Sequence, residues 1–316
     1  MTIDKNPNDL GLDIEPEVED GVTAEDAADV VRGTSRLKLY VRRFFRNKLA
    51  VVGLVIFVLL AILAVVGEYC AAWKFDDPDF LNISSPPSPE HWFGTNDSGN
   101  DLFAQTAHGL GRSLIIAVTV SLGTSILSAV IGAGAALFGG WLEKLTLLLI
   151  HFLLAIPAFL LIALMVSSSG GDWKMLIIVL IGFGWYYPAR VIWSLSLGIR
   201  EQDYVRAAKY MGVSYAKIIT RHMIPNIGSL LIIYFVLGVV GTVMSETALS
   251  FLGLGVKLPD VSLGTLLTGG TASLVSTPWQ FYFPAAVLTL LTVSMALIAD
   301  GLRDALDPNS KSGGNA

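Results

Sequence analysis

Six long apolar stretches dominate the chain, separated by polar segments that carry most of the charge. As a helix rising ~1.5 Å per residue, each stretch is about long enough to cross the ~30 Å hydrocarbon layer of a membrane. In lipid a helix satisfies its own backbone polar groups, so these stretches are expected to be helical. The pattern predicts an all-α, polytopic membrane bundle with six transmembrane helices, at residues 49–67, 113–138, 145–166, 175–195, 227–249 and 281–299.

Glycine and proline affect the interpretation of three of these predicted spans. The second span is rich in Gly, Ala and Ser and contains Gly132 and Gly134. These small residues favour close helix packing, and a kinked or re-entrant segment is the alternative. Pro157 lies inside the third span and Pro188 near the end of the fourth. Neighbouring helices can satisfy the backbone groups that a proline leaves unpaired, so both prolines are compatible with membrane helices.

The composition agrees with a membrane protein. Of all residues, 53% are hydrophobic and only 15% are charged, whereas a soluble domain has about 25% charged residues. The charge is uneven, because residues 1–30 hold ten acids against one base. This segment lacks apolar periodicity, which predicts a disordered acidic tail over residues 1–33. It has no secretory signal. Residues 34–67 are therefore expected to form a basic entry segment followed by a first transmembrane helix that is not cleaved off.

The basic residues also predict the orientation of the chain. With both termini placed in the cytoplasm, the inner segments hold seventeen Lys and Arg and the outer segments hold four. This asymmetry follows the positive-inside rule and predicts cytoplasmic termini. The predicted parts are an outer segment at 68–112, a core at 113–308 with five spans and a cytoplasmic loop at 200–226, and a flexible C-terminus at 309–316.

The outer segment contains an acidic turn that has two interpretations. Its sequence GTNDSGND places Asp97 and Asp101 close together, as in a calcium-binding loop. The spacing lacks the full ligand set and the terminal Glu, so an ordinary turn is favoured. The lone Cys70 excludes an intrachain disulfide and a cysteine-based metal site. We therefore expect no metal site in this chain.

The loop at 200–226 is too long for a tight turn and too polar to enter the membrane. Good helix formers from Arg200 to Tyr210 predict one helix, and Gly212 falls at the position of a C′ glycine. Ser214 can N-cap a second helix that continues to about Met223, before a break at Pro225. The result would be a helix–turn–helix elbow outside the membrane, and we call residues 200–226 the elbow throughout. Its bases equally allow a helix pair that rests on anionic lipid.

The sequence RAAKYMGVSYAKIITRHMIPN in this loop resembles the "EAA" loop of ABC importer permeases. That pattern combines an Ala-Ala step with a later Gly and a Pro near the end, and in that family the loop docks into a groove on the ATPase subunit. Arg206 replaces the Glu of the family pattern. The resemblance implies that the ATPase-coupling residues are Arg206, Ala207, Ala208, Lys209, Gly212, Ser214 and Pro225.

Further blocks are similar to the C-type permease subunits of oligopeptide, dipeptide and nickel importers. They are RRFFRNKLAVVGL, HWFGTNDSGNDLFAQTAHGLGRSL, SETALSFLGLGVKLPDVSLGTLL and DGLRDALDP. The resemblance implies a bacterial inner-membrane importer, most simply for peptides, with nickel chelates, haem and other solutes left open. The implied partners are a second permease, two ATPase subunits that bind ATP and Mg, and an extracytoplasmic substrate-binding protein. Membrane lipid is a further expected partner, and nucleic acid is not.

Catalytic chemistry is not expected in this chain. The sequence has no Walker motif and no nucleophile–base constellation, so ATP hydrolysis is assigned to a partner and no cofactor is expected here. A secondary transporter would carry inverted repeats and ionisable groups within its spans. The six predicted spans carry almost no such groups. Glu246, near the outer end of the fifth span, is a candidate for the translocation path. The alternative is that it caps a turn or packs against the sixth span.

Overall fold

The computed structural model describes residues 36–168 and 170–306, and helices are the regular secondary structure of this part of the chain, apart from two isolated β-bridges. The acidic tail predicted at 1–33 and the C-terminus predicted at 309–316 lie outside the described residues. The helices are α2 (Arg36–Arg46), α3 (Lys48–Cys70), α4 (Leu102–Phe138), α5 (Gly140–Ala155), α6 (Ala158–Ser167), α7 (Trp173–Gly184), α8 (Tyr186–Arg200), α9 (Asp203–Tyr210), α10 (Tyr215–Ile218), α11 (Ile224–Asn226), α12 (Gly228–Phe251), α13 (Leu263–Ala272) and α14 (Trp279–Leu306).

Among the described residues, five helical stretches are long and apolar enough to cross a membrane. They are α3, α4, the α7–α8 stretch, α12 and α14. The pair α5 and α6 passes the same test together but bends by 80°, so it is either a sixth, broken span or a re-entrant loop. The all-helical, multi-pass membrane architecture is confirmed, and the described residues contain five or six candidate spans.

Helix α4 is longer than the hydrophobic pattern predicts. It begins at Leu102 instead of residue 113, and the side chain of Asp101 caps it by accepting a hydrogen bond from the Ala104 N–H at 2.7 Å. The predicted outer segment is correspondingly shorter and covers residues 71–101. Because α4 runs unbroken to Phe138, its glycines mark close packing and not a kink. A Cβ added to Gly132 would lie 2.6 Å from the Ala189 carbonyl oxygen of α8.

Two of the predicted spans are broken helices. The third divides at Ile156 and Pro157 into α5 and α6, because proline has no N–H to continue the helix. The fourth divides at Trp185, shortly before Pro188. The carbonyl of Trp185 accepts a hydrogen bond from the Ser128 hydroxyl of α4 at 2.8 Å. The same carbonyl also accepts the Ala189 N–H at 3.0 Å, so the Ser128 hydroxyl adds a second bond that joins the break to α4.

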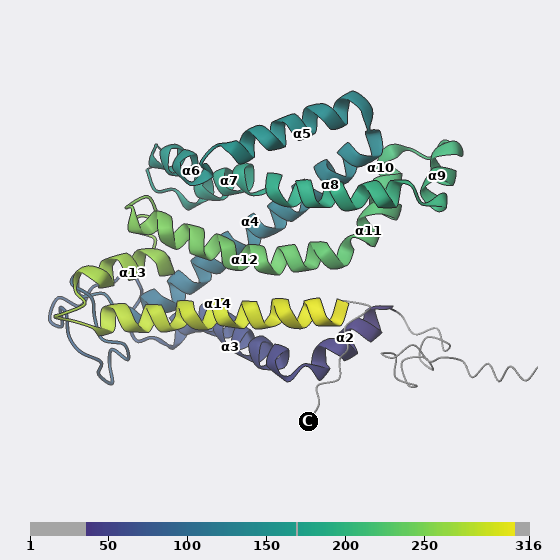
Figure 1. The fold of residues 1–316 in the computed structure, drawn as a ribbon. Coiled ribbons are helices and arrows are strands. Elements are labelled where there is room, and N and C mark those ends of the chain that lie inside the picture. The colour runs from purple at the N-terminus through teal and green to yellow at the C-terminus, as the bar shows by residue number, and fades with distance from the viewer. Residues whose placement is uncertain (1–35, 169, 307–316) are drawn as a thin grey trace, which may run out of the picture.

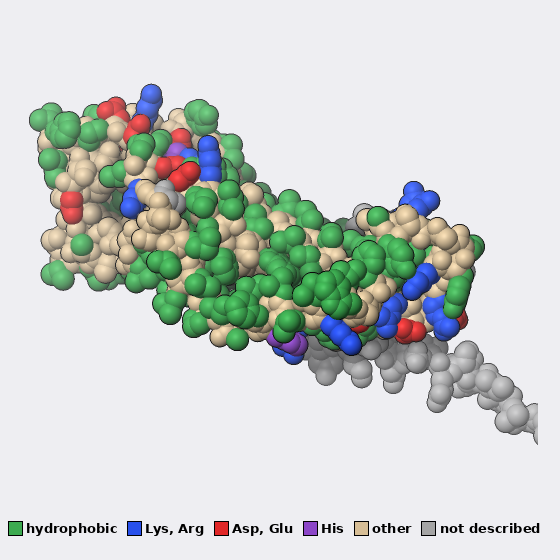
Figure 2. Space-filling view, turned by 90° about the horizontal axis from the view of Figure 1, so that it is seen from above, with side chains coloured by type: hydrophobic (Ala, Val, Ile, Leu, Met, Phe, Trp, Pro, Cys, Tyr) green, Lys and Arg blue, Asp and Glu red, His purple; other side chains and the backbone are tan. Residues whose placement is uncertain are grey.

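The helices form an elongated bundle with two distinct ends (Figure 1). Helices α3 and α14 pack on one side of α4, and α8 packs on the other. At one end lie residues 71–101 and α13, and we call this the loop end. At the other end lie α2, the C-terminal end of α14 and the elbow. Figure 2 shows hydrophobic side chains across the middle of the molecule and charged side chains at both ends, as expected for a bundle that spans lipid.

Candidate functional site

The first half of the elbow is a short helix that ends on a glycine. Helix α9 begins at Asp203, three residues later than predicted, because α8 continues through Arg200. Gly212 has φ +74°, and the N–H of Val213 donates to the Ala208 carbonyl at 3.1 Å. The Gly212 N–H donates to the Lys209 carbonyl at the same distance. These two bonds define a Schellman motif, and the predicted C′ glycine is confirmed.

The second half of the elbow differs from the prediction. Ser214 occupies the N-cap position, but its side chain makes no capping bond. Helix α10 ends at Ile218, and a π-helical turn over Ile219–Met223 leads into α11. The predicted break at Pro225 is wrong, because α11 runs through this residue and the break falls at Ile227. The π-helical turn changes the hydrogen-bonding register just before the proline, so its missing N–H does not end the helix.

One face of the elbow is anchored in the bundle. Val205, Ala208, Ile218 and Met223 are buried in a single apolar cluster. The cluster also contains Ala133, Ala136 and Leu137 of α4 and Ile192 of α8. A polar bond adds to this anchor, since Arg200 Nη1 donates to the Ala136 carbonyl at 2.9 Å. The elbow therefore moves with the ends of α4 and α8, because packed apolar interiors transmit displacement.

The opposite face of the elbow is exposed. Ala207 lies on this face, whereas Ala208 is only 3% exposed. The expectation that both alanines face a partner is therefore wrong for Ala208, which packs against the bundle. Tyr210 is 84% exposed and Met211 is 75% exposed, so two large apolar side chains form the tip. Sequence reasoning missed both, although an aromatic residue and a Met beside a C′ glycine could have indicated a contact surface.

A cavity of about 430 Å³ opens between the elbow and the end of α4. Arg200, Arg206 and Lys209 line it, together with the single acid Glu201. Arg206 and Lys209 are exposed, so their charges remain hydrated. The cavity is therefore electropositive, and Arg206 contributes a cation where the family pattern has a carboxylate. A carboxylate on a partner would complement this charge.

Glu246 lies at a helix junction and not in a cavity. The residue is 1% exposed, and its Oε1 accepts hydrogen bonds from the hydroxyls of Ser250 at 2.8 Å and Ser262 at 2.6 Å. Ser262 also caps α13. The carboxylate thus joins α12 to the start of α13. Glu246 thus has a packing role, but its partner lies at the start of α13 and not on the sixth span as the alternative expected. A role in the translocation path stays a prediction.

The loop end is held together by polar side chains. His91 Nδ1 and Asp101 Oδ2 are 2.8 Å apart, and both residues are buried. Asp97 accepts bonds from Ser84, Ser273 and Gln280 at 2.7, 2.6 and 2.9 Å. These three bonds hold the pKa of Asp97 below its usual value, because they stabilise the ionised carboxylate. The acidic turn is thus tied to the start of α14.

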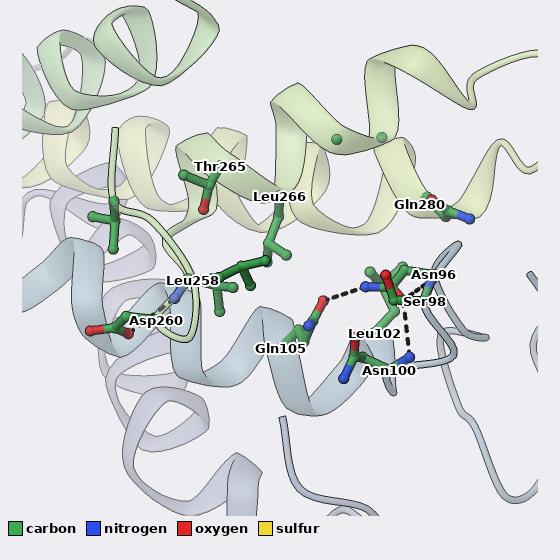
Figure 3. Close-up of a pocket in the computed structure, with 14 residues that line it drawn as sticks. Asn96, Ser98, Asn100, Leu102, Gln105, Leu258, Asp260, Thr265, Leu266 and Gln280 are labelled. Carbon is green, nitrogen blue, oxygen red and sulfur yellow. Dashed lines mark hydrogen bonds between the residues drawn. The ribbon is translucent and has the colours of Figure 1, made fainter. Parts of the chain in front are cut away.

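A pocket of about 240 Å³ lies beside this turn (Figure 3). Asn96, Asn100, Gln105 and Gln280 line it, and the Asn96 amide donates to Gln105 Oε1 at 3.0 Å. Other polar side chains of this pocket are bonded to groups outside it, since Gln105 also donates to the Phe75 carbonyl at 3.1 Å and Gln280 donates to Asp97 at 2.9 Å. Among the residues that the structure describes, no group of three or more His, Cys, Asp or Glu side chains is placed to hold a metal ion.

Comparison with known proteins gives consistent matches over most of the chain. Residues 128–312 match the family model described as binding-protein-dependent transport system inner membrane component. Residues 35–87 match the N-terminal transmembrane domain of oligopeptide transport permease C. The oligopeptide transport system permease protein OppC of Mycobacterium bovis is 43% identical over 280 residues, covering 88% of this chain and 96% of the relative.

More distant relatives carry the same name. OppC of Haemophilus influenzae is 35% identical over 272 residues, covering 85% of this chain and 88% of the relative. OppC of Bacillus subtilis is 32% identical over 266 residues, covering 84% of this chain and 87% of the relative. The similarity therefore extends over the helices of the bundle and is not confined to the elbow.

Proposed function

The chain belongs to the family of binding-protein-dependent transport system inner membrane components, and from this premise we propose that it forms half of the transport path of an ATP-driven peptide importer. As an ABC permease it is a membrane transport component and not an enzyme. The peptide substrate is inferred from the names of its relatives. A second permease completes the path, two ATPase subunits bind ATP and Mg, and an external binding protein delivers the substrate.

The two-faced elbow carries this proposal. One face is buried against α4 and α8, and the other exposes Ala207, Tyr210 and Met211. An element that is rigidly joined to two spans and exposes an apolar tip can transmit the motion of a partner to the path. Protein interfaces are enriched in Tyr, Met and Arg at their core, which matches this tip and the adjacent Arg206.

We place both termini in the cytoplasm and the loop end outside, in a bacterial inner membrane. This orientation puts the elbow, α2 and most Lys and Arg residues on the side where ATP is available. The bent pair α5–α6 then counts as the sixth span, which brings the C-terminus back to the inner side. Ser88→Cys and Ser310→Cys are each introduced into a chain from which Cys70 has been removed. An impermeant thiol reagent applied to intact cells should label Ser88→Cys and leave Ser310→Cys unlabelled. Labelling of Ser310→Cys would overturn this topology.

Reconstitution of the complete complex tests the function. The chain is co-purified with the second permease and the two ATPase subunits of the proposed complex. The complex is then placed in proteoliposomes with the binding protein. Uptake of a labelled peptide should require ATP and should stop when the binding protein is omitted. Uptake that follows an ion gradient without ATP would instead identify a secondary transporter.

Ala207→Leu tests the role of the elbow in that assay. The larger side chain would separate two packed surfaces, at a typical cost of about 1–3 kcal/mol. Docking should weaken about five- to a hundredfold, with loss of uptake and of stimulated ATP hydrolysis. The matched control is Ala286→Leu, which enlarges an exposed alanine on α14 away from the elbow. Equal, near-normal activity of both variants would remove the elbow from the mechanism.

A further inference from the structure

A cavity of about 390 Å³ opens beside the central part of α12. Its walls come from α4, α6, α7, α8 and α12, so it lies at mid-length in the bundle. The polar side chains that line it are Thr124, Ser125, Tyr187, Tyr234, Thr242 and Ser245. We call this cavity the hydroxyl groove. Its location places it within the membrane-spanning part of the molecule.

The hydroxyl groove is polar but uncharged. None of the residues that line it, all within the described part of the chain, is Asp, Glu, Lys, Arg or His. The neighbouring residues Ser245 and Glu246 of α12 illustrate this difference between uncharged and charged side chains. Ser245 lines the groove, whereas Glu246 does not line it and its carboxylate accepts a hydrogen bond from Ser262 at 2.6 Å. The one carboxylate of α12, Gly228–Phe251, therefore does not line the groove.

Several of these hydroxyls have no hydrogen-bond partner within the described chain. Thr124 and Ser245 bond backbone carbonyls of their own helices. Within residues 36–168 and 170–306, no such bond holds the hydroxyls of Tyr187, Tyr234 or Thr242, and Tyr187 is 60% exposed. An unpaired hydroxyl in hydrocarbon is costly. These groups therefore favour water or a polar ligand in the groove over lipid tails.

The backbone around the groove is also typical of a ligand-binding cavity in a membrane. Tyr187 follows the break between α7 and α8, and interrupted helices are tolerated where they line a cavity. Gly241 faces the groove, and a Cβ added there would meet no atom within 4 Å. The wall formed by α12 therefore leaves room that a larger residue would fill.

We propose that the hydroxyl groove is this chain's part of the substrate path and that it contacts the peptide backbone without selecting side-chain charge. The proposal rests on the proposed function and names the substrate chemistry of its path. Hydroxyl groups can donate to peptide carbonyls and accept from peptide N–H groups. Because the groove holds no fixed charge, acidic, neutral and basic peptides meet the same electrostatic environment.

Filling the groove should block transport. Gly241→Phe is expected to lower peptide uptake in the reconstituted complex about tenfold or more, equal to about 1.4 kcal/mol in the barrier. Gly182→Phe is the matched control, because Gly182 is also exposed and unobstructed but lies on α7 outside the groove. This control should remain within about twofold of the unmodified complex. Normal uptake by Gly241→Phe would overturn the proposal while leaving the importer function intact.

A charge placed in the groove should create selectivity. Ser245→Asp is expected to lower uptake of a Glu-containing tripeptide about tenfold relative to a Lys-containing one, compared with the ratio in the unmodified complex. Ser245→Asn is the uncharged control and should leave this ratio unchanged. A ratio that Ser245→Asp does not alter would show that substrate does not pass this side chain.

Thiol labelling tests access to the groove without transport. In a chain lacking Cys70, Ser245→Cys should react with a water-soluble thiol reagent in the assembled complex. Leu59→Cys should not, because Leu59 is 61% exposed on the apolar surface of α3. If Ser245→Cys is labelled in a complex that fails to import peptides, the groove is accessible to water but the peptide-importer function is rejected. Equal resistance of both cysteines would show that the groove faces lipid.

Discussion

At the loop end, buried and half-buried polar side chains bond one another across segments that are far apart in sequence. Asp97 reaches Ser273 and Gln280, and Asp260 pairs with Arg112 of α4 at 2.7 Å. At the elbow, the fixed contacts are mainly apolar and join the buried faces of α9, α10 and the π-helical turn to α4 and α8. The exposed face of the elbow carries Tyr210 and Met211, which make few contacts within the chain.

The two ends are therefore suited to different tasks. Directional hydrogen bonds hold the loop end in one arrangement, because each buried polar group that loses its partner costs free energy. Apolar packing joins the elbow to two spans as one body, and the exposed tip remains available to a partner. Mutations should separate these properties, with stability effects at the loop end and coupling effects at the exposed face of the elbow.

The largest loss of stability is expected from Asp101→Ala. This change removes the cap of α4 and leaves a buried ring nitrogen of His91 without its acceptor. The two effects together should lower the free energy of unfolding by about 2–4 kcal/mol. Thermal unfolding in detergent measures the loss. Asp101→Asn, which retains an acceptor for the cap, should be less affected, and equal stability of Asp101→Ala and the unmodified chain would contradict the role of this network.

Ala208→Leu and Ala207→Leu should separate packing from docking. Ala208 is buried beside α4, so leucine there should destabilise the chain by about 1–3 kcal/mol. Ala207 is exposed, and leucine there should change the unfolding free energy by less than about 0.5 kcal/mol. Unfolding midpoints of the two purified variants test this difference. Similar midpoints would mean that the two alanines do not lie on opposite faces.

Gly212→Val should disturb the turn of the elbow. A β-branched side chain at φ +74° is expected to cost about 1–2 kcal/mol, without affecting membrane insertion. The assembled complex should then hydrolyse ATP without peptide uptake, or fail to bind its ATPases. Gly212→Asn is the control, because asparagine tolerates the left-handed conformation. Full coupled transport by Gly212→Val would show that the geometry of the turn is unimportant.

The smallest expected effect is a pH dependence at the loop end. The folded-state pKa of Asp97 is lowered, so its contribution to stability is present above the unfolded value of about 3.9 and is lost as pH falls through the lowered pKa. The stability difference between the unmodified chain and Asp97→Asn should therefore be constant from pH 7 to about pH 5 and shrink below about pH 4. Unfolding curves at stepped pH measure this difference. A difference that grows on acidification would contradict the assignment.

The sequence predicts local features of the fold better than tertiary ones. Gly212 could be placed because helix formers precede it and polar residues follow, a pattern that requires only short-range geometry. The start of α4 could not be placed by hydropathy, because Gln105 and Arg112 count as polar. Their partners, the Phe75 carbonyl at 3.1 Å and Asp260, come from distant segments. The longest helix of the bundle therefore looks shorter in the sequence than it is.

The same limit applies to the candidate site. The resemblance identified the elbow, but Ala207 and Ala208 are equivalent in sequence, and only the packing on α4 shows which one faces outward. Pro225 was expected to end a helix, and the preceding π-helical turn is a tertiary feature that no local propensity indicates. The partners of Glu246 include Ser262, sixteen residues away in another helix cap. The hydroxyl groove combines residues from five helices and has no signature in any one of them.

Photo-crosslinking from the exposed face of the elbow tests directly whether this face docks on an ATPase subunit. A photoreactive amino acid replaces Met211 in one variant and Tyr69, 87% exposed near the loop end, in another. Both variants are assembled into a complex that hydrolyses ATP, irradiated and analysed by mass. An adduct is expected between position 211 and an ATPase subunit, and none from position 69. An active complex in which position 211 gives no such adduct, or position 69 does, would show that the elbow does not dock on the ATPase.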